Sequence, residues 1–340
     1  MRVRSASTGI PSGLRLPSLT LGKDLLTLRD MTPQDLTGLL RLAAELKRRQ
    51  QKGVLYQPLQ GRTLGLIFEK PSTRTRVSFE AGIGQLGGRS LFLSAGDIQL
   101  SRGESIADTA QVLSRYLDGL VIRTYDHWIV EEWANHASIP VINGLTDWCH
   151  PCQALSDLMT IQERVGRLAE LKLAYVGDGN NVTNSLIEAA AKTGMTIAVG
   201  CPTGYEPDQR VVDLSREEAL RTGGTIEVTT SAAVAVKDAD VIYTDVWVSM
   251  GREREKARRF KALAPYQVNE RLLKLAKPAA IVMHCLPAHR GEEITASVLD
   301  GPQSAVLDQA ENRLHMQKAI LVMLLTRARA AGRAKGRASS

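Results

Sequence analysis

Long apolar runs, cysteine clusters and aromatic residues are all scarce in this 340-residue sequence. Its four cysteines, Cys149, Cys152, Cys201 and Cys285, are too few and too scattered for a disulfide scaffold and are typical of a reducing compartment. The longest apolar run, Ala319–Leu325, is far short of the roughly 18 residues that a membrane-spanning helix needs. We therefore expect no membrane partner. The length suffices for two domains with separate cores.

Acidic residues are absent from both ends of the chain, and this explains a formal net charge of +7. Residues 1–20 hold three arginines, and residues 327–340 hold four arginines and one lysine. Removing these eight from the 43 basic residues leaves 35, against 36 acidic residues. A nucleic-acid-binding protein carries its basic surface on a folded face. We therefore expect no nucleic-acid partner, and two flexible terminal segments.

The N-terminal segment is rich in arginine and serine and lacks acidic residues, as organelle transit peptides do. Pro11, Gly13 and Pro17 interrupt the amphipathic helix of such a peptide, and no apolar signal-peptide core is present. These features favour a simple N-terminal extension on a cytoplasmic protein, with the mitochondrial matrix as the alternative location.

Two common nucleotide-binding motifs are missing. The GxxxxGK[ST] phosphate loop is absent. Gly177 and Gly179 follow an apolar run and precede a helix, but Val182 stands where a dinucleotide fingerprint needs its third glycine. The next strand also ends without the acidic residue that binds ribose. We therefore expect no nicotinamide cofactor, and Asn180, Asn181 and Asn184 suit another polar ligand.

Short apolar runs that indicate strands alternate with segments of helical periodicity along the whole chain. Thr32, followed by Pro33 and by Asp35 at the third helical position, predicts the start of the first long helix. Strands are expected at residues 63–68, 89–93, 118–124, 140–145, 171–177, 196–200, 225–230, 241–247 and 280–287. The pattern predicts two α/β domains, each with a mostly parallel sheet flanked by helices, and a ligand site in the cleft between them.

The stretch Phe68–Glu80, with sequence FEKPSTRTRVSFE, concentrates hydrogen-bonding side chains at a strand-to-helix junction. A helix N-terminus offers unpaired N–H groups and a partial positive charge, which together bind phosphate well. Hydroxyl groups and planar guanidinium groups add donors that match phosphate oxygens. The local sequence alone leaves two readings open: an anion site or a decorated helix cap.

The segment TDWCHPCQALSDL resembles a thioredoxin-type redox motif, since a strand precedes Cys149 and Cys152 and a helix follows them. However, it follows an intact α/β domain, whereas a redox motif stands near the start of a domain. A zinc site with His284 and Cys285 is a second alternative, although no second CxxC pair exists. We favour a third reading, in which His150 and Gln153, one helical turn apart, project into the cleft.

Two later strands also end in chemically active residues. Asp245 stands at a strand end, and a loop with Ser249 and Met250 follows it. His284 and Cys285 end a buried strand, but neighbouring strand residues face opposite sides, so a Cys–His nucleophilic pair is not favoured.

Taken together, these segments resemble the aspartate/ornithine carbamoyltransferase family, and within it the ornithine branch. The family's Ser-Thr-Arg-Thr-Arg motif matches Ser72–Arg76, and its His-Pro-x-Gln motif matches His150–Gln153. The ornithine branch adds Asp-x-Trp-x-Ser-Met-Gly, matched by Asp245–Gly251, and His-Cys-Leu-Pro, matched by His284–Pro287. The resemblance runs from Lys23 to Ala328 with the motifs in the expected order.

The resemblance implies a homotrimer, or an assembly of trimers, with active sites at the subunit boundaries. It also implies an N-terminal domain that binds carbamoyl phosphate, a C-terminal domain that binds the amino acid, and a last helix that returns to the first domain. The expected ranges are 1–22 for a flexible extension, 23–152 for the carbamoyl phosphate domain, 153–310 for the ornithine domain, 311–328 for the returning helix, and 329–340 for a basic flexible tail.

The resemblance also implies site residues, carried over motif by motif. The expected carbamoyl phosphate ligands are Ser72, Thr73, Arg74, Thr75, Gln99 from a neighbouring subunit, Arg123, His150, Gln153, Cys285, Leu286 and Arg313. The expected ornithine ligands are Asn181, Asp245, Ser249 and Met250. Within these sets, Arg123, His150 and Cys285 are the expected catalytic residues.

The reaction implied is transfer of the carbamoyl group from carbamoyl phosphate to the side-chain amine of L-ornithine, by direct attack through a tetrahedral intermediate. The products are citrulline and phosphate, and arginine biosynthesis is the expected role, with arginine breakdown as the reverse direction. No metal or organic cofactor is expected. Asp245 is expected to select the substrate's α-ammonium group, and Cys285 to orient the reacting amine.

Three alternatives share parts of this pattern. Aspartate carbamoyltransferases have His-Pro-Leu-Pro-Arg as the last motif and a lysine in the loop that corresponds to residues 99–103, whereas this chain has neither. Putrescine as acceptor would leave Asp245 and the Ser-Met-Gly loop without a function. A catalytically silent phosphate sensor would be expected to lose Arg123, His150 or Cys285, and all three are present.

Overall fold

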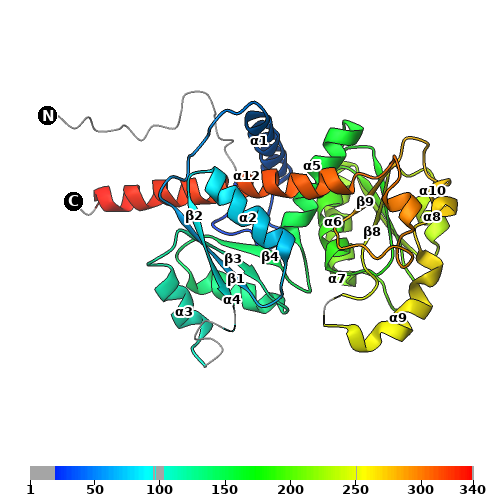
Figure 1. Ribbon diagram of the computed structural model, residues 1–340, viewed down its shortest axis with the longest axis horizontal. Helices are drawn as coiled ribbons and strands as arrows, with labels where there is room; N and C mark the ends of the chain where they lie inside the picture. Colours follow the sequence, from blue (N-terminus) through cyan, green and yellow to red (C-terminus); the bar gives the residue numbers. More distant parts are fainter. Residues whose placement is uncertain (1–19, 95, 97–102, 250, 339–340) are drawn as a thin grey trace.

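The computed structural model describes residues 20–94, 96, 103–249 and 251–338, and side chains as far as residue 326. Two parallel sheets form the centres of two α/β domains, as the strand pattern predicted (Figure 1). No helix among the described residues is both long and apolar enough to span a membrane.

The first sheet has the strand order β2-β1-β3-β4, and all its pairings are parallel. Its strands are β1 (Thr63–Phe68), β2 (Arg89–Ser94), β3 (Gly119–Arg123) and β4 (Val141–Leu145). Side chains alternate between its two faces, because successive strand residues point in opposite directions. Leu66 and Val121 belong to a large core with helices of one face, whereas Ile67 and Ile122 belong to a separate core on the other.

Helices cover both faces of this sheet. Those packed on the large-core side are α1 (Pro33–Gln51), α2 (Thr73–Gln85) and α12 (Val306–Ala338), and those on the other side are α3 (Ile106–Leu113) and α4 (His127–His136). The predicted start of α1 is confirmed: the Thr32 hydroxyl accepts from Asp35 N, and the Asp35 carboxylate accepts from Thr32 N. This reciprocal pair is a capping box.

The second sheet has the order β7-β6-β5-β8-β9 and is also parallel throughout. Its strands are β5 (Lys172–Val176), β6 (Thr196–Gly200), β7 (Thr225–Thr229), β8 (Val241–Thr244) and β9 (Ile281–His284). Its helices are α5 (Pro151–Val165), α6 (Asn181–Thr193), α7 (Gln209–Thr222), α8 (Ala232–Val236), α9 (Lys256–Leu263), α10 (Glu270–Leu273) and α11 (Ala296–Leu299), with short 3₁₀ turns η2 (Glu253–Glu255) and η3 (Ala264–Tyr266). Helix α6 ends where Gly194 adopts a φ of 71°, which a residue with a side chain rarely adopts.

Helix α12 joins the two domains. It packs against β9 of the second sheet and against α5, α1 and α2, and in Figure 1 it crosses the top of the molecule from the second sheet to the first. It begins before and ends after the range 311–328 that the sequence suggested, and it includes most of the basic C-terminal segment.

In each sheet the direction in which successive strands are added reverses at one position, and such positions are where ligands bind in open parallel sheets. In the first sheet the reversal lies between β1 and β3, and in the second it lies between β5 and β8. Loops that leave the carboxyl ends of such neighbouring strands diverge and open a crevice. The anion motif follows β1, Arg123 ends β3, Gly177 follows β5, and Asp245 follows β8.

Candidate active site

A cavity of about 940 Å³ opens between the two domains at these strand ends. Every predicted site residue within the described ranges lines it, and these are Ser72, Thr73, Arg74, Thr75, Arg123, His150, Gln153, Asn181, Asp245, Ser249, Cys285, Leu286 and Arg313. Gln99 and Met250, which complete the predicted set, lie outside the described residues.

The N-terminus of α2 forms one end of this cavity. Ser72 is the N-cap residue, and its hydroxyl oxygen accepts from Thr75 N at 3.2 Å. Thr73 and Arg74 in the first turn also line the cavity. Arg76 does not: its guanidinium lies 3.7 Å from the centre of the Phe92 ring and pairs with Glu80, so it braces the helix. Of the two readings of the motif, the anion site is the one that this geometry favours.

Six guanidinium groups line the same cavity. Three of them, from Arg74, Arg123 and Arg313, form no salt bridge with a carboxylate of the described residues, whereas Arg259 pairs with Asp178. Burial and, to a smaller extent, the charges of Arg313 and Arg74 lower the pKa of Arg123 to about 10. Arg123 still carries its proton at neutral pH. A cluster of like charges without counter-ions is stabilised when a polyanion binds, which again indicates a phosphate-bearing ligand.

His150 and Gln153 enter the cavity from the start of α5. His150 is the N-cap residue of α5, and its backbone N–H donates to the Ser185 hydroxyl at 2.8 Å. Burial lowers the pKa of His150 well below its usual value, and Arg313 and Arg123 lower it further, so the imidazole is neutral at pH 7. Its Nδ1 atom is buried without a hydrogen-bond partner. A neutral imidazole can donate one hydrogen bond to a ligand without adding charge.

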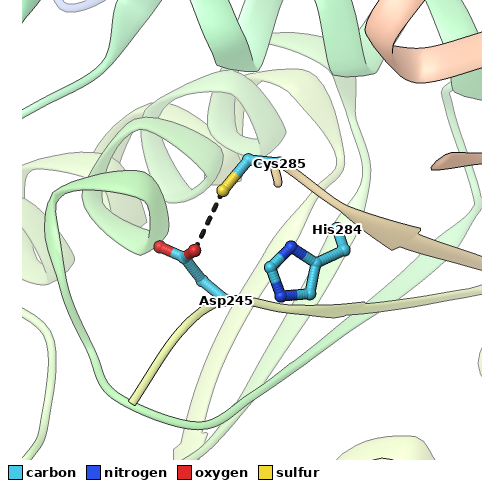
Figure 2. Close-up of side chains that lie close together, drawn as sticks. All are labelled: Asp245, His284 and Cys285. Atoms are coloured by element: carbon cyan, nitrogen blue, oxygen red, sulfur yellow. Dashed lines mark hydrogen bonds between the residues drawn. The ribbon is translucent and has the colours of Figure 1, made fainter. Parts of the chain in front are cut away.

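The opposite wall presents a carboxylate. Asp245 is buried, and its Oδ2 atom accepts from Asn180 Nδ2 at 2.7 Å. Its Oδ1 atom accepts from Cys285 Sγ at 2.9 Å and from Val246 N at 2.8 Å. Figure 2 shows the Cys285 side chain pointing towards Asp245. Asp245 thus presents to the cavity a buried carboxylate that is held in place by neutral donors.

Cys285 is a thiol rather than a thiolate. Burial raises its pKa well above the usual value, and the neighbouring Asp245 charge raises it further. His284 does not act as its base, because both ring nitrogens are engaged elsewhere: Nε2 lies 3.2 Å from Glu293 Oε1, and Nδ1 accepts from Leu286 N at 2.9 Å. The geometry therefore gives no support to a Cys–His nucleophilic pair, which the sequence also did not favour.

The remaining predicted residues lie around this wall. Asn181, at the start of α6, donates from Nδ2 to Thr146 O at 2.6 Å. Leu286 has a φ of 59°, a rarely populated conformation for a residue with a side chain, and its N–H bond to His284 helps to hold it there. Ser249 follows β8 and lines the cavity beside Asp245.

The cavity has further lining residues, of which the sequence indicated Asn180 but not Arg259 or Lys70. Asn180 caps α6 and binds the Asp245 carboxylate, and Arg259 pairs with Asp178 at 2.7 Å and donates to Trp247 O. Lys70 and Asp147, which also line the cavity, form an ion pair. The cluster of asparagines after β5 was a usable signal for Asn180. Arg259 lay in a charged run that reads as a solvated helix face.

Two groups of side chains lie close enough to hold a metal ion. The ligand atoms of Asp245, His284 and Cys285 lie within 4.8 Å of one another, as do those of His289, Glu292 and Glu293. In the first group, each ligand residue already has a protein partner. Among the described residues neither group includes Cys149 or Cys152, so the CxxC pair does not join His284 and Cys285 in a zinc site.

Two parallel-sheet domains that face one cavity, with a cationic wall on one side and a carboxylate wall on the other, have the arrangement of a two-substrate transferase. The carbamoyl-P binding domain model of the aspartate/ornithine carbamoyltransferases matches residues 23–163, and the Asp/Orn binding domain model matches residues 169–324. The chain belongs to the aspartate/ornithine carbamoyltransferase family.

Individual relatives support this assignment. The chain is 58% identical over 304 residues to an ornithine carbamoyltransferase from Anoxybacillus flavithermus, covering 89% of this chain and 97% of that protein. The solved structure of the ornithine carbamoyltransferase from Pyrococcus furiosus is similar with a TM-score of 0.88 and 53% identity, over 91% of this chain and 98% of that one. A mitochondrial ornithine carbamoyltransferase from Coccidioides immitis gives a TM-score of 0.83 at 37% identity, over 90% of this chain and 98% of that one.

Proposed function

We propose that this chain transfers the carbamoyl group of carbamoyl phosphate to the side-chain amine of L-ornithine and releases L-citrulline and phosphate. The observation that carries the proposal is the shared cavity, in which the α2 N-terminus and three arginines face Asp245. A dianionic donor and a cationic acceptor match these two walls. Relatives at 55–58% identity bear the name ornithine carbamoyltransferase, which favours ornithine over aspartate.

Carbamoyl phosphate is proposed to bind at the first domain. Its phosphate would accept hydrogen bonds from the start of α2, from the hydroxyls of Ser72 and Thr73, and from Arg74. Arg313 already joins this wall, because its NH2 group donates to Thr75 Oγ1 at 2.6 Å. Gln99 of a neighbouring subunit remains part of the proposal.

The carbamoyl group is proposed to lie against Thr75, Arg123, His150 and Gln153, with Cys285 and Leu286 at its far side. Attack by the amine places negative charge on the carbonyl oxygen, and donors aimed at that oxygen stabilise it. Arg123 is protonated and His150 is neutral, so both can donate without a prior proton transfer. As the C–O bond to phosphate breaks, Arg74 and the α2 N-terminus offset the growing phosphate charge.

Ornithine is proposed to bind at the second domain, with Asn181, Asp245, Ser249 and Met250 around its α-amino and α-carboxylate groups. The Asp245 carboxylate would take the α-ammonium. Cys285, which donates to Asp245, would orient the reacting amine rather than attack the substrate. The attacking amine must be neutral, and with a reference pKa near ~10.4 only about one amine in a few thousand is neutral at pH 7.

The proposal also covers assembly and location. Residues 23–152 would form the carbamoyl phosphate domain, residues 153–310 the ornithine domain, and 311–328 the helix that returns to the first. We propose a homotrimer, arginine biosynthesis and a cytoplasmic location. The motif resemblance supports the first two, and four free cysteines support a reducing compartment.

A direct assay tests the reaction. The purified chain is incubated with carbamoyl phosphate and ornithine, aspartate or putrescine, and the ureido product is measured for each. Citrulline from ornithine, at a rate far above that of the other two amines, is the expected result. Product from aspartate or putrescine alone would overturn the proposal. Sedimentation or light scattering gives the oligomeric state in the same preparation.

A further inference from the structure

Asp157 is a carboxylate on α5 that lies behind the candidate active site and is fully buried. Its Oδ1 atom accepts from Gln153 Nε2 and from Gln309 Nε2, both at 2.8 Å. Its Oδ2 atom accepts from the Tyr243 hydroxyl at 3.0 Å. All three neighbours donate to Asp157, and an ionised carboxylate can accept all three hydrogen bonds on its two oxygens.

These bonds determine which way the Gln153 amide faces. Because its Nε2 group is bound by Asp157, its Oε1 atom faces Arg313, whose NH1 group donates to it at 2.5 Å. Arg313 then reaches Thr75 at the phosphate end. If the amide turned over, its NH2 group would face the Arg313 guanidinium, and two donors would oppose each other.

A second line of hydrogen bonds leads from Asp157 to the other wall. Gln309 donates to Tyr243 as well as to Asp157, and its Oε1 atom accepts from His284 N at 2.9 Å. His284 directly precedes Cys285. Asp157 is therefore joined through α5 to the carbamoyl phosphate wall and through α12 to the strand that ends at Cys285.

We propose that Asp157 is a positioning residue for carbamoyl transfer: its carboxylate fixes the Gln153 amide so that Gln153 Oε1 and Arg313 are preset for the carbamoyl phosphate, and it holds Gln309 against β9. Asp157 itself does not touch substrate. The inference rests on the proposed function of the cavity.

The charge state of Asp157 gives the proposal a measurable signature. Burial raises the pKa of Asp157, and the hydrogen bonds from Gln153, Gln309 and Tyr243 together with the charge of Arg313 offset part of this effect, which leaves the pKa at about 7. The titratable and charged groups that face it are Tyr243 from β8, Arg313 from α12 and Cys285 at the end of β9. When pH falls through this range the carboxyl gains a proton and loses its negative charge, which weakens the hydrogen bonds that hold Gln153 and Gln309.

Binding of phosphonoacetamide, in which a methylene group replaces the bridging oxygen of carbamoyl phosphate, tests this by calorimetry at pH 8. Asp157→Asn keeps the shape and an oxygen that can accept from both glutamines, but it removes the negative charge that strengthens these bonds, so the Kd of the variant should rise about tenfold. Tyr243→Phe keeps the Asp157–Gln153 bond and should stay within about threefold of wild type. Glu188→Gln, a buried carboxylate outside the cavity, is the matched control and should bind as wild type does.

The same titrations at pH 6 separate positioning from general stability. At each pH we compare the Kd of Asp157→Asn with that of wild type as a ratio. Ionisation of the ligand affects both Kd values equally, so it does not change this ratio. We expect this ratio to shrink towards one, because wild-type Asp157 becomes protonated and the variant cannot. Asp157→Glu retains a titrating group, so its ratio to wild type should change less with pH. It also serves as the second variant if Asp157→Asn does not fold.

Three outcomes would overturn the inference. Wild-type affinity in Asp157→Asn excludes a positioning role. Equal losses of affinity and melting temperature in Asp157→Asn and Tyr243→Phe indicate a structural role only. If the wild-type chain does not bind the analogue, the proposed function fails and the positioning role falls with it.

Discussion

Replacing Asp245 by asparagine is the sharpest test of how the second wall recognises its substrate. In the structure Asp245 accepts from three donors, Cys285 Sγ and Val246 N on Oδ1 and Asn180 Nδ2 on Oδ2. An asparagine offers one acceptor and one NH2 group. In one orientation the NH2 group opposes Asn180, and in the other it opposes Val246 N, so either leaves two donors facing each other.

The expected loss of activity follows from the hydrogen bonds that Asp245→Asn removes. Asp245→Asn removes a charge-assisted hydrogen bond to the proposed α-ammonium of ornithine and leaves one buried donor unpaired, which together cost about 2–4 kcal/mol. At 1.36 kcal/mol per factor of ten, kcat/KM for ornithine should fall roughly thirtyfold to a thousandfold. The Kd of phosphonoacetamide should change less than about threefold, because that ligand is proposed to contact the other wall.

Steady-state kinetics with ornithine varied at saturating carbamoyl phosphate gives kcat/KM for ornithine, and calorimetry gives the Kd of phosphonoacetamide. Asp240→Asn is the matched control: Asp240 directly precedes the opposite end of β8, where it accepts from Lys172 N and pairs with Lys277. This variant should lose stability without a change in either substrate constant. An Asp245→Asn enzyme with unchanged kcat/KM for ornithine would refute the reasoning, as would an equal loss of affinity for both ligands.

Three further predictions concern charge. Arg123→Met should lower kcat on the order of a hundredfold, since it removes a donor from the proposed carbonyl oxygen site; unchanged kcat would exclude that role. The rate with subsaturating ornithine should climb with pH because the amine must be neutral, and a flat profile from pH 6 to 9 would contradict this. Burial raises the pKa of Glu188 from 4.5 to about 7, so the folded state holds a proton that the unfolded state has lost between these values, and stability falls as pH rises. The free energy of unfolding in urea should therefore rise for Glu188→Gln relative to wild type, by about 2 kcal/mol between pH 5.5 and pH 8. If the difference between the two proteins were the same at both pH values, Glu188 would not titrate in this range.

Local signals in the sequence predicted most of the elements. The first strand, Thr63–Phe68, has the bounds that its apolar run indicated, and the Thr32 cap lies where its chemistry placed it. These features depend on neighbours a few residues away, and a single sequence shows such neighbours directly. Helix α12 was less well bounded, because its start at Val306 depends on packing against strands and helices from both domains.

The geometry of the site depends on contacts between distant parts of the chain, and the sequence alone does not reveal most of these contacts. Asp157 looks like an ordinary polar position on a helix, yet one of its partners, Gln309, is 152 residues away. Asn180 could be recognised as polar, but not as the partner of Asp245, which lies 65 residues further on. The motif resemblance supplied the site residues, and the fold then explained why they converge, since both sheets reverse their strand order at the cavity.

The path of α12 has a consequence for how the chain is made. Thr75 meets Arg313 across 238 residues, and the buried faces of α1 and α2 pack against α12. During synthesis, which proceeds from the N-terminus, the first domain therefore emerges with an apolar face exposed and its phosphate site unfinished. The apolar face stays uncovered, and the contact between Thr75 and Arg313 cannot form, until α12 has left the ribosome. Nascent or prematurely terminated chains would be expected to depend on chaperones, and the proposed binding of the donor substrate would require that α12 has been synthesised.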